Sequence, residues 1–167
     1  LTLEDIDTSV NLTNDGNLSI TQADDDILGT LDITALGDLS IAGNVNSQDA
    51  TANAIAFTSG GDMIFNADVT AATGANSAIT LTAGGDIVDA KNAADSTIDT
   101  PTLTIRGADN IGSSTGDDQL DIEVDTLTIA LAGGGAAVSG DTYIREEDGL
   151  TITDVDTDGG FSLISDA

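Results

Sequence analysis

The sequence predicts an all-β protein, a right-handed parallel β-helix (β-solenoid) of about seven coils. Three observations support this fold class: short runs alternate apolar and polar residues, a similar segment recurs at a fixed offset, and no stretch sustains a helical apolar period. The 167 residues, 40% of them hydrophobic, suffice for one domain with a sizeable core. We therefore treat residues 1–167 as a single solenoid segment.

The strands are predicted from a three-residue pattern in which two apolar residues flank one that is usually polar. This alternation directs the outer two side chains to the interior and the middle one to solvent. Strands this short cannot stand as isolated hairpins, so we expect them to stack on other strands. The pattern occurs at Leu1–Leu3, Val10–Leu12, Leu18–Ile20, Leu31–Ile33, Leu39–Ile41, Ile55–Phe57, Met63–Phe65, Ile79–Leu81, Leu103–Ile105, Leu120–Ile122, Leu127–Ile129, Leu150–Ile152 and Phe161–Leu163.

The stacking distance along the chain is predicted from repeated turns. Ile55–Met63 matches Ile79–Ile87 at an offset of 24, and both segments contain Gly-Gly-Asp. The turns at Gly16 and Gly37 are related by an offset of 21. Repeats of roughly 21–24 residues with two or three short strands are typical of a parallel β-helix, and crossover rules favour its right-handed form. A β-sandwich is the alternative, although its strands are usually longer.

The beginning of the chain resembles a segment near its end. Leu1–Thr8 reappears as Leu150–Thr157, with five of eight positions identical. We interpret residues 1–167 as about one period, of about 149 residues, in a longer tandem array. Because a solenoid exposes open strand edges at both ends, non-covalent head-to-tail stacking is the other interpretation.

Charge and composition exclude several classes of function. The chain has 30 acidic and 3 basic residues, a net charge of −27, which argues against binding to nucleic acid or to an anionic membrane. No apolar run approaches the ~20 residues of a membrane helix, so we expect no membrane insertion. The chain has no His and no Cys, which removes the common general base and the thiol nucleophile. We expect no enzyme; a carbohydrate-active enzyme is the remote alternative.

One segment has the residue types of a calcium loop. Asp154, Asp156 and Asp158 alternate before two glycines, and calcium takes six to eight oxygen ligands. The EF-hand pattern would require Glu where Ser165 stands, and an inward Val155 would separate the carboxylates. The calcium site at these three residues is therefore a hypothesis beside the simpler one of solvated turn acids. We interpret the clusters Asp24–Asp26 and Asp117–Asp118 as loop acids whose negative charge is screened by diffuse cations and not by discretely bound ions.

The outward residues of the predicted strands include several hydroxyl side chains. They are Thr2, Ser19, Ser40, Thr80, Thr104, Thr128 and Thr151. An ice-binding face would require such residues in register on one side, usually as Thr-x-Thr. The Asp and Ala residues at equivalent positions argue against this function.

Around its Gly-Gly-Asp turns the chain resembles the filamentous-haemagglutinin-type giant repetitive bacterial surface proteins. The resemblance rests on Ala54–Met63 and Ala78–Ile87, with similar stretches at Leu127–Ile129 and Gly149–Asp156. It implies a right-handed β-helical shaft, extracellular or at the cell surface, used in adhesion or as a structural fibre.

Together these observations predict a structural segment of an extracellular fibre, filament or sheath built from stacked β-helical coils. Its partners would be copies of itself, end to end or side by side, with divalent cations joining the acidic surfaces. The alternative is an adhesin shaft whose loops, Lys91–Thr100 and Gly107–Asp118, bind a host or matrix ligand.

Overall fold

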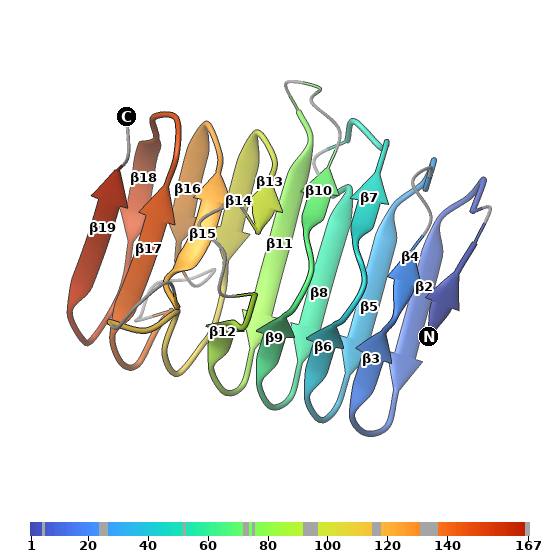
Figure 1. Ribbon diagram of the computed structural model, residues 1–167, viewed down its shortest axis with the longest axis horizontal. Helices are drawn as coiled ribbons and strands as arrows, with labels where there is room; N and C mark the ends of the chain where they lie inside the picture. The colour runs from blue at the N-terminus through green and yellow to red at the C-terminus, as the bar shows by residue number, and fades with distance from the viewer. Residues whose placement is uncertain are drawn as a thin grey trace.

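The computed structural model describes residues 1–4, 6–23, 27–51, 53–71, 74, 76–91, 97–114, 118–130 and 137–165. Within these ranges the chain is all-β and has no helix, hence none able to cross a membrane. Its strands pair in parallel and wind into a β-solenoid, as predicted (Figure 1). The parallel pairing between successive coils rules out the β-sandwich, whose sheets are antiparallel.

Three stacked sheets form the faces of the solenoid, and a short fourth sheet lies at its N-terminal end. The seven-stranded sheet contains β2 (Val10–Asn14), β5 (Leu31–Ala35), β8 (Ile55–Ser59), β11 (Ala78–Ala83), β14 (Thr102–Ile105), β16 (Thr126–Ile129) and β18 (Thr151–Val155). The six-stranded sheet contains β7 (Val45–Ser47), β10 (Val69–Ala71), β13 (Ile98–Asp99), β15 (Leu120–Glu123), β17 (Thr142–Glu146) and β19 (Phe161–Ser165). The four-stranded sheet contains β3 (Leu18–Ile20), β6 (Leu39–Ile41), β9 (Met63–Phe65) and β12 (Ile87–Asp89), and the two-stranded sheet contains β1 (Thr2–Leu3) and β4 (Gln22–Ala23).

The register between coils confirms the predicted repeat. Ile55 of β8 pairs with Ile79 of β11, which is the offset expected from the two Gly-Gly-Asp segments. Leu18 pairs with Leu39 at the shorter offset expected for the first coils. Equivalent residues of successive coils therefore lie side by side in columns along the solenoid axis.

The core consists of these columns of inward side chains. Leu31, Ile55, Ile79, Leu103 and Leu127 form one column in the seven-stranded sheet, and all five are fully buried. Burying one such side chain contributes about 1.5–3 kcal/mol. Since each coil repeats the same inward residues, apolar burial stabilises the whole length of the solenoid.

The predicted number of coils was slightly too high, because the solenoid makes about five turns. The seven-stranded sheet has a strand for each predicted coil, but the four-stranded sheet ends at β12. Beyond β12, Ile111 continues this face only through isolated bridges to Ile87 and Thr142. The later coils thus have two strands where the earlier ones have three.

Four strands that the apolar pattern missed or placed only in part end on small or polar inward residues. β7, β10, β12 and β17 end at Ser47, Ala71, Asp89 and Glu146, all of them buried. At three of these positions, Ser47, Asp89 and Glu146, the side chain accepts a hydrogen bond from a backbone N–H of the turn that follows. Ser47 Oγ, for example, accepts a hydrogen bond of 3.2 Å from the backbone N–H of Asp49.

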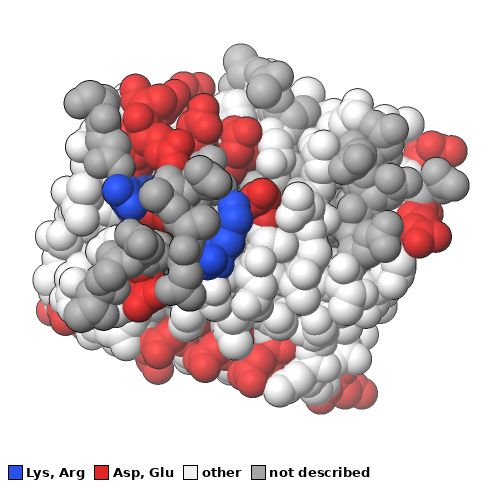
Figure 2. All heavy atoms as spheres, in the orientation of Figure 1, with Lys and Arg blue, Asp and Glu red and all other residues white. Residues whose placement is uncertain are grey.

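The turns between the seven-stranded and four-stranded sheets are joined by a ladder of Asn and Asp side chains. In each coil the side-chain Oδ1 accepts a hydrogen bond from the backbone N–H of the equivalent residue one coil later, at 2.8–3.1 Å. Figure 2 shows acidic side chains along the lower edge, where these turns lie in Figure 1. The members of this Asx ladder are Asn17, Asp38, Asp62, Asp86, Asn110 and Asp141, and it ends at the N–H of Gly160.

The two similar end segments occupy different places in the solenoid. Thr2 and Leu3 form β1, which pairs with β4. In the second copy, Thr151–Val155 forms β18, which pairs with β16 in the seven-stranded sheet. The tandem array stays a prediction, and the two copies do not hold equivalent positions within these residues.

Candidate functional site

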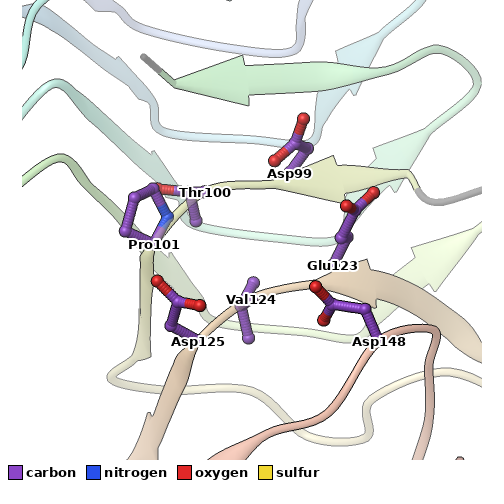
Figure 3. Close-up of a pocket in the computed structure, with 7 residues that line it drawn as sticks. All are labelled: Asp99, Thr100, Pro101, Glu123, Val124, Asp125 and Asp148. Carbon is purple, nitrogen blue, oxygen red and sulfur yellow. The ribbon is translucent and has the colours of Figure 1, made fainter. Parts of the chain in front are cut away.

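Four carboxylates gather around a small cavity on the C-terminal coils. Asp99 and Glu123 end β13 and β15 and pair in register, one coil apart. Asp125 precedes β16, and Asp148 lies in the turn after β17. With Thr100, Pro101 and Val124, they line a cavity of about 150 Å³ (Figure 3). We call Asp99, Glu123, Asp125 and Asp148 the acidic cluster.

The proximity of these acids raises two pKa values. Burial raises the pKa of the Asp99 carboxyl, and the negative charge of Asp148 adds to this shift. The pKa of Asp148 is raised by a side-chain hydrogen bond with Glu146, then by partial desolvation and by the charges of Glu146, Glu123 and Asp125. Like charges at short range disfavour ionisation, so the cluster is a region of strong negative potential.

The position of Asp148 is set by the turn in which it lies. Glu146 is buried, and its Oε1 accepts hydrogen bonds from the N–H groups of Asp148 at 2.9 Å and Gly149 at 2.8 Å. Gly149 has a φ of 118°, which a residue with a side chain rarely adopts. The buried glutamate and the glycine together direct the turn, and with it Asp148, toward the cavity (Figure 3).

The chemistry open to this cluster is attraction of cations without a defined coordination shell. No basic residue lines the cavity to neutralise the four acids. Among the residues that the structure describes, no group of three or more acidic side chains is arranged to hold a metal ion. Four carboxylates without a basic neighbour favour cations near the cavity, although within the described residues they do not form a metal-ligand group.

The residues predicted to bind calcium lie elsewhere, at the last coil. Asp154 is exposed in β18, and its neighbour Val155 pairs with the buried Ile129, as expected of an inward residue. Asp156 and Asp158 follow in the loop, held by backbone bonds to Ile129 at 2.7 Å and Val138 at 2.9 Å. The structure does not bring the three carboxylates into a ligand group, although all three are described.

A second cavity, of about 390 Å³, lies beside the predicted adhesin loops. Its lining includes Val88, Asp89 and Asp118. Asp89 is buried and accepts hydrogen bonds from Thr97 Oγ1 at 2.5 Å and from the Lys91 N–H at 2.9 Å. This carboxylate holds both ends of the segment that leads from β12 to β13.

Some predicted features fall on residues outside those described. They are all of Asp24–Asp26, residues 92–96 of the loop Lys91–Thr100, and residues 115–117 of the loop Gly107–Asp118, which include Asp117. The described parts of the two loops are more regular than expected, because they contain β13 and the bridging Ile111.

Sequence reasoning missed the acidic cluster, although one signal was present. Asp99 and Glu123 are separated in sequence by one coil offset, so acids at this spacing are expected to stack. Asp125 and Asp148 reach the same cavity from turns, where no apolar alternation fixes the direction of a side chain.

No family model, curated protein or solved structure matches this chain. The resemblance to filamentous-haemagglutinin-type proteins thus rests on the turn motifs alone.

Proposed function

We propose that this chain is a structural segment of an extracellular fibre, filament or sheath built from stacked β-helical coils. The observation that supports the proposal is the partly exposed apolar side chains on β18 and β19, the last strands that the structure describes. β18 and β19 are the last strands of their sheets, so within the described residues each has one edge without a neighbouring strand. Their inward residues Ile152 and Phe161 remain 42% and 37% exposed, whereas the equivalent Leu127 and Thr142 are fully buried.

An open end of this kind favours addition of further strands. Unpaired backbone N–H and C=O groups along a strand edge are a template for another parallel strand. At the other end, Val10, Leu12 and Leu18 of β2 and β3 are only half-buried against the core. Stacking one end on the other would continue the same apolar columns, which is the geometry that a fibre of coils requires.

The surface charge suits a fibre that stays separate from its neighbours. With a net charge of −27, solenoids lying side by side repel one another at low ionic strength. Divalent cations gathered at the acidic cluster would reduce this repulsion and join adjacent fibres. We place the fibre outside the cell or at its surface, in line with the resemblance of the turn motifs.

The test compares one inward with one outward residue of β19. Sedimentation velocity and electron microscopy over a range of concentrations should show end-to-end oligomers of the purified chain. Phe161→Asp should keep the chain monomeric, because it places a charge on the apolar end. Ser162→Asp, exposed on the opposite side of the same strand, is the matched control and should still assemble. A wild-type chain that stays monomeric at every concentration contradicts non-covalent stacking.

The intact mass of the polypeptide from its source, under denaturing conditions, decides how the coils are continued. A mass many times 16.7 kDa indicates a covalent tandem array. A mass near that value indicates separate subunits that stack head to tail.

A second candidate is an adhesin shaft, favoured by the cavity at Val88 and Asp118 beside the two predicted loops. Val88 is exposed there despite its apolar side chain, as expected of a contact residue. Deleting residues 92–96 separates the two functions. Loss of adhesion with intact assembly supports the adhesin. Unchanged adhesion argues against binding through this loop.

A further inference from the structure

Aspartate is followed directly by glycine in several turns of this chain. In such a pair the backbone nitrogen of the glycine can attack the side-chain carboxyl of the aspartate and close a five-membered succinimide ring. A glycine favours this closure because it has no Cβ to obstruct the approach. The surroundings of each pair then decide which one reacts. The pairs are Asp15-Gly16, Asp148-Gly149 and Asp158-Gly159.

At Asp148-Gly149 the attacking group is in contact with the carboxylate of Glu146. Oε1 and Oε2 of Glu146 accept the N–H of Gly149 at 2.8 Å and 2.9 Å. A general base must lie within about 2.6–3.2 Å of the atom whose proton it takes, and both oxygens satisfy this condition. Glu146 is buried, and a further bond of 2.9 Å from the N–H of Asp148 holds it in place. The base is therefore already positioned in the folded turn.

The same carboxylate contacts the group that would be attacked. A side-chain hydrogen bond with Glu146 raises the pKa of Asp148, and desolvation and the charges of Glu146, Glu123 and Asp125 add to the shift. Because ionised carboxylates only accept hydrogen bonds, this bond requires a proton on one of the two groups. A protonated Asp148 can lose its hydroxyl as water, which an ionised one cannot. Glu146 thus lies between the proton of the nucleophile and the oxygen that leaves.

Asp15-Gly16 provides a matched comparison within the same molecule. Asp15 and Asp148 are both exposed, so water reaches both. A Cβ built on Gly16 or Gly149 would meet no heavy atom within 4 Å, so both turns have room to rearrange. The turn at Gly16 is closed through its carbonyl, to which Asn14 Nδ2 donates at 2.8 Å, and a neutral amide is not a general base. The two sites therefore differ in the carboxylate beside the attacking nitrogen.

We infer that Asp148-Gly149 is a self-modification site at which Glu146 acts as general base and then general acid for succinimide formation. Glu146 takes the amide proton of Gly149 while the nitrogen forms a bond to Cγ of the protonated Asp148. It then returns the proton to the departing hydroxyl, and one water leaves. Solvent hydrolyses the ring, which regains that water and yields either aspartate or isoaspartate. The reaction consumes nothing else.

This inference rests on the turn alone and holds whether or not the chain assembles into fibres. Isoaspartate carries the main chain through the side-chain carbon, so the backbone between Glu147 and Gly149 becomes one carbon longer. Its carboxylate is then attached at Cα and leaves the position that Asp148 occupies in the acidic cluster. The modification would therefore change the charge distribution at the cavity as the protein ages.

Incubation of the folded chain in water labelled with heavy oxygen tests the inference. Tandem mass spectrometry of the digested protein counts every ring opening at each pair, including those that restore aspartate. In the folded wild type the label should enter Asp148 at least about tenfold faster than Asp15, since general acid–base catalysis contributes about 10²–10⁴-fold. In urea, where Glu146 no longer holds the turn, the two rates should become equal.

Glu146→Gln keeps an oxygen that accepts the N–H groups of the turn and removes the base. It should lower the rate at Asp148 to that at Asp15, while the Asp15 rate in the same molecule stays unchanged. Circular dichroism reports whether the variant folds; if it does not, the comparison of folded and urea-unfolded wild type decides alone. A folded wild type in which Asp148 reacts no faster than Asp15 overturns the inference. A folded Glu146→Gln variant that labels Asp148 at the wild-type rate also overturns it.

Discussion

The Oδ1 atom of Asp62 accepts a hydrogen bond of 2.9 Å from the backbone N–H of Asp86, the equivalent residue one coil later. Asp62 itself donates its N–H to Asp38 at 3.1 Å. Each member of the Asx ladder after Asn17 therefore accepts a hydrogen bond from one neighbouring coil and donates one to the other. The ladder joins successive turns where the regular strand pairing is interrupted.

Replacing Asp62 tests how much this ladder contributes. Asp62→Ala leaves the partly buried N–H of Asp86 without its acceptor, and should lower the free energy of unfolding by about 1–2 kcal/mol. Asp62→Asn keeps an acceptor of the same shape, as Asn17 and Asn110 do naturally, and should be neutral or slightly stabilising. Urea denaturation of both variants measures the difference. Equal stabilities would mean that the ladder is only a consequence of the strand pairing.

The glycine before each acid of the Gly-Asp turns makes room for the ladder. A Cβ on Gly61 would lie inside van der Waals distance of Asp38 Oδ1, which is fixed by its bond to Asp62. Gly61→Ala should therefore cost about 1–3 kcal/mol, through overpacking and displacement of this carboxylate. Gly16→Ala is the matched control, because its Cβ would meet no heavy atom within 4 Å. Thermal unfolding should separate the two; a Gly61→Ala variant as stable as Gly16→Ala would contradict the steric explanation.

The fold was predictable because its signal is local and repeated. All thirteen apolar triplets overlap strands, and the offset between Ile55 and Ile79 is the register itself. The acidic cluster was not predictable in the same way. Asp148 reaches Asp99 through a turn fixed by Glu146 and Gly149, and such turns follow no apolar period. The end of the four-stranded sheet at Asp89 was missed for a related reason, since a buried carboxylate replaces the apolar residue there.

Substitutions at two neighbouring residues of β11 test the inward and outward assignment. Leu81 is fully buried, so Leu81→Asp places a charge without a partner in the apolar columns and should abolish cooperative unfolding. Thr80 points outward between Ala56 and Thr104, and Thr80→Asp should change stability by about 0.5 kcal/mol or less. Circular dichroism melting curves report both. If the two variants were equally well tolerated, β11 would not have the assigned orientation.

The raised pKa of Asp99 predicts how its contribution to stability depends on pH. Because the carboxyl binds its proton more tightly in the folded state than in the unfolded chain, its stabilising effect is complete below the ordinary value of 3.8 and is lost as pH rises through the folded pKa. At pH 7 the ionised Asp99 is left partly desolvated beside Asp148. Asp99→Asn should then be more stable than the wild type, by up to about 1 kcal/mol after solvent screening.

This advantage of Asp99→Asn should shrink as pH falls and vanish below the ordinary pKa of Asp, where the wild-type carboxyl is protonated too. Urea denaturation of both proteins from pH 3 to pH 7 measures the difference, in which the titration of acids that do not interact with Asp99 cancels. Glu4→Gln, exposed at the opposite end of the solenoid, controls for the change in net charge. A stability difference that is constant with pH, or equal to that of Glu4→Gln, would show that burial and the charge of Asp148 do not raise the pKa of Asp99.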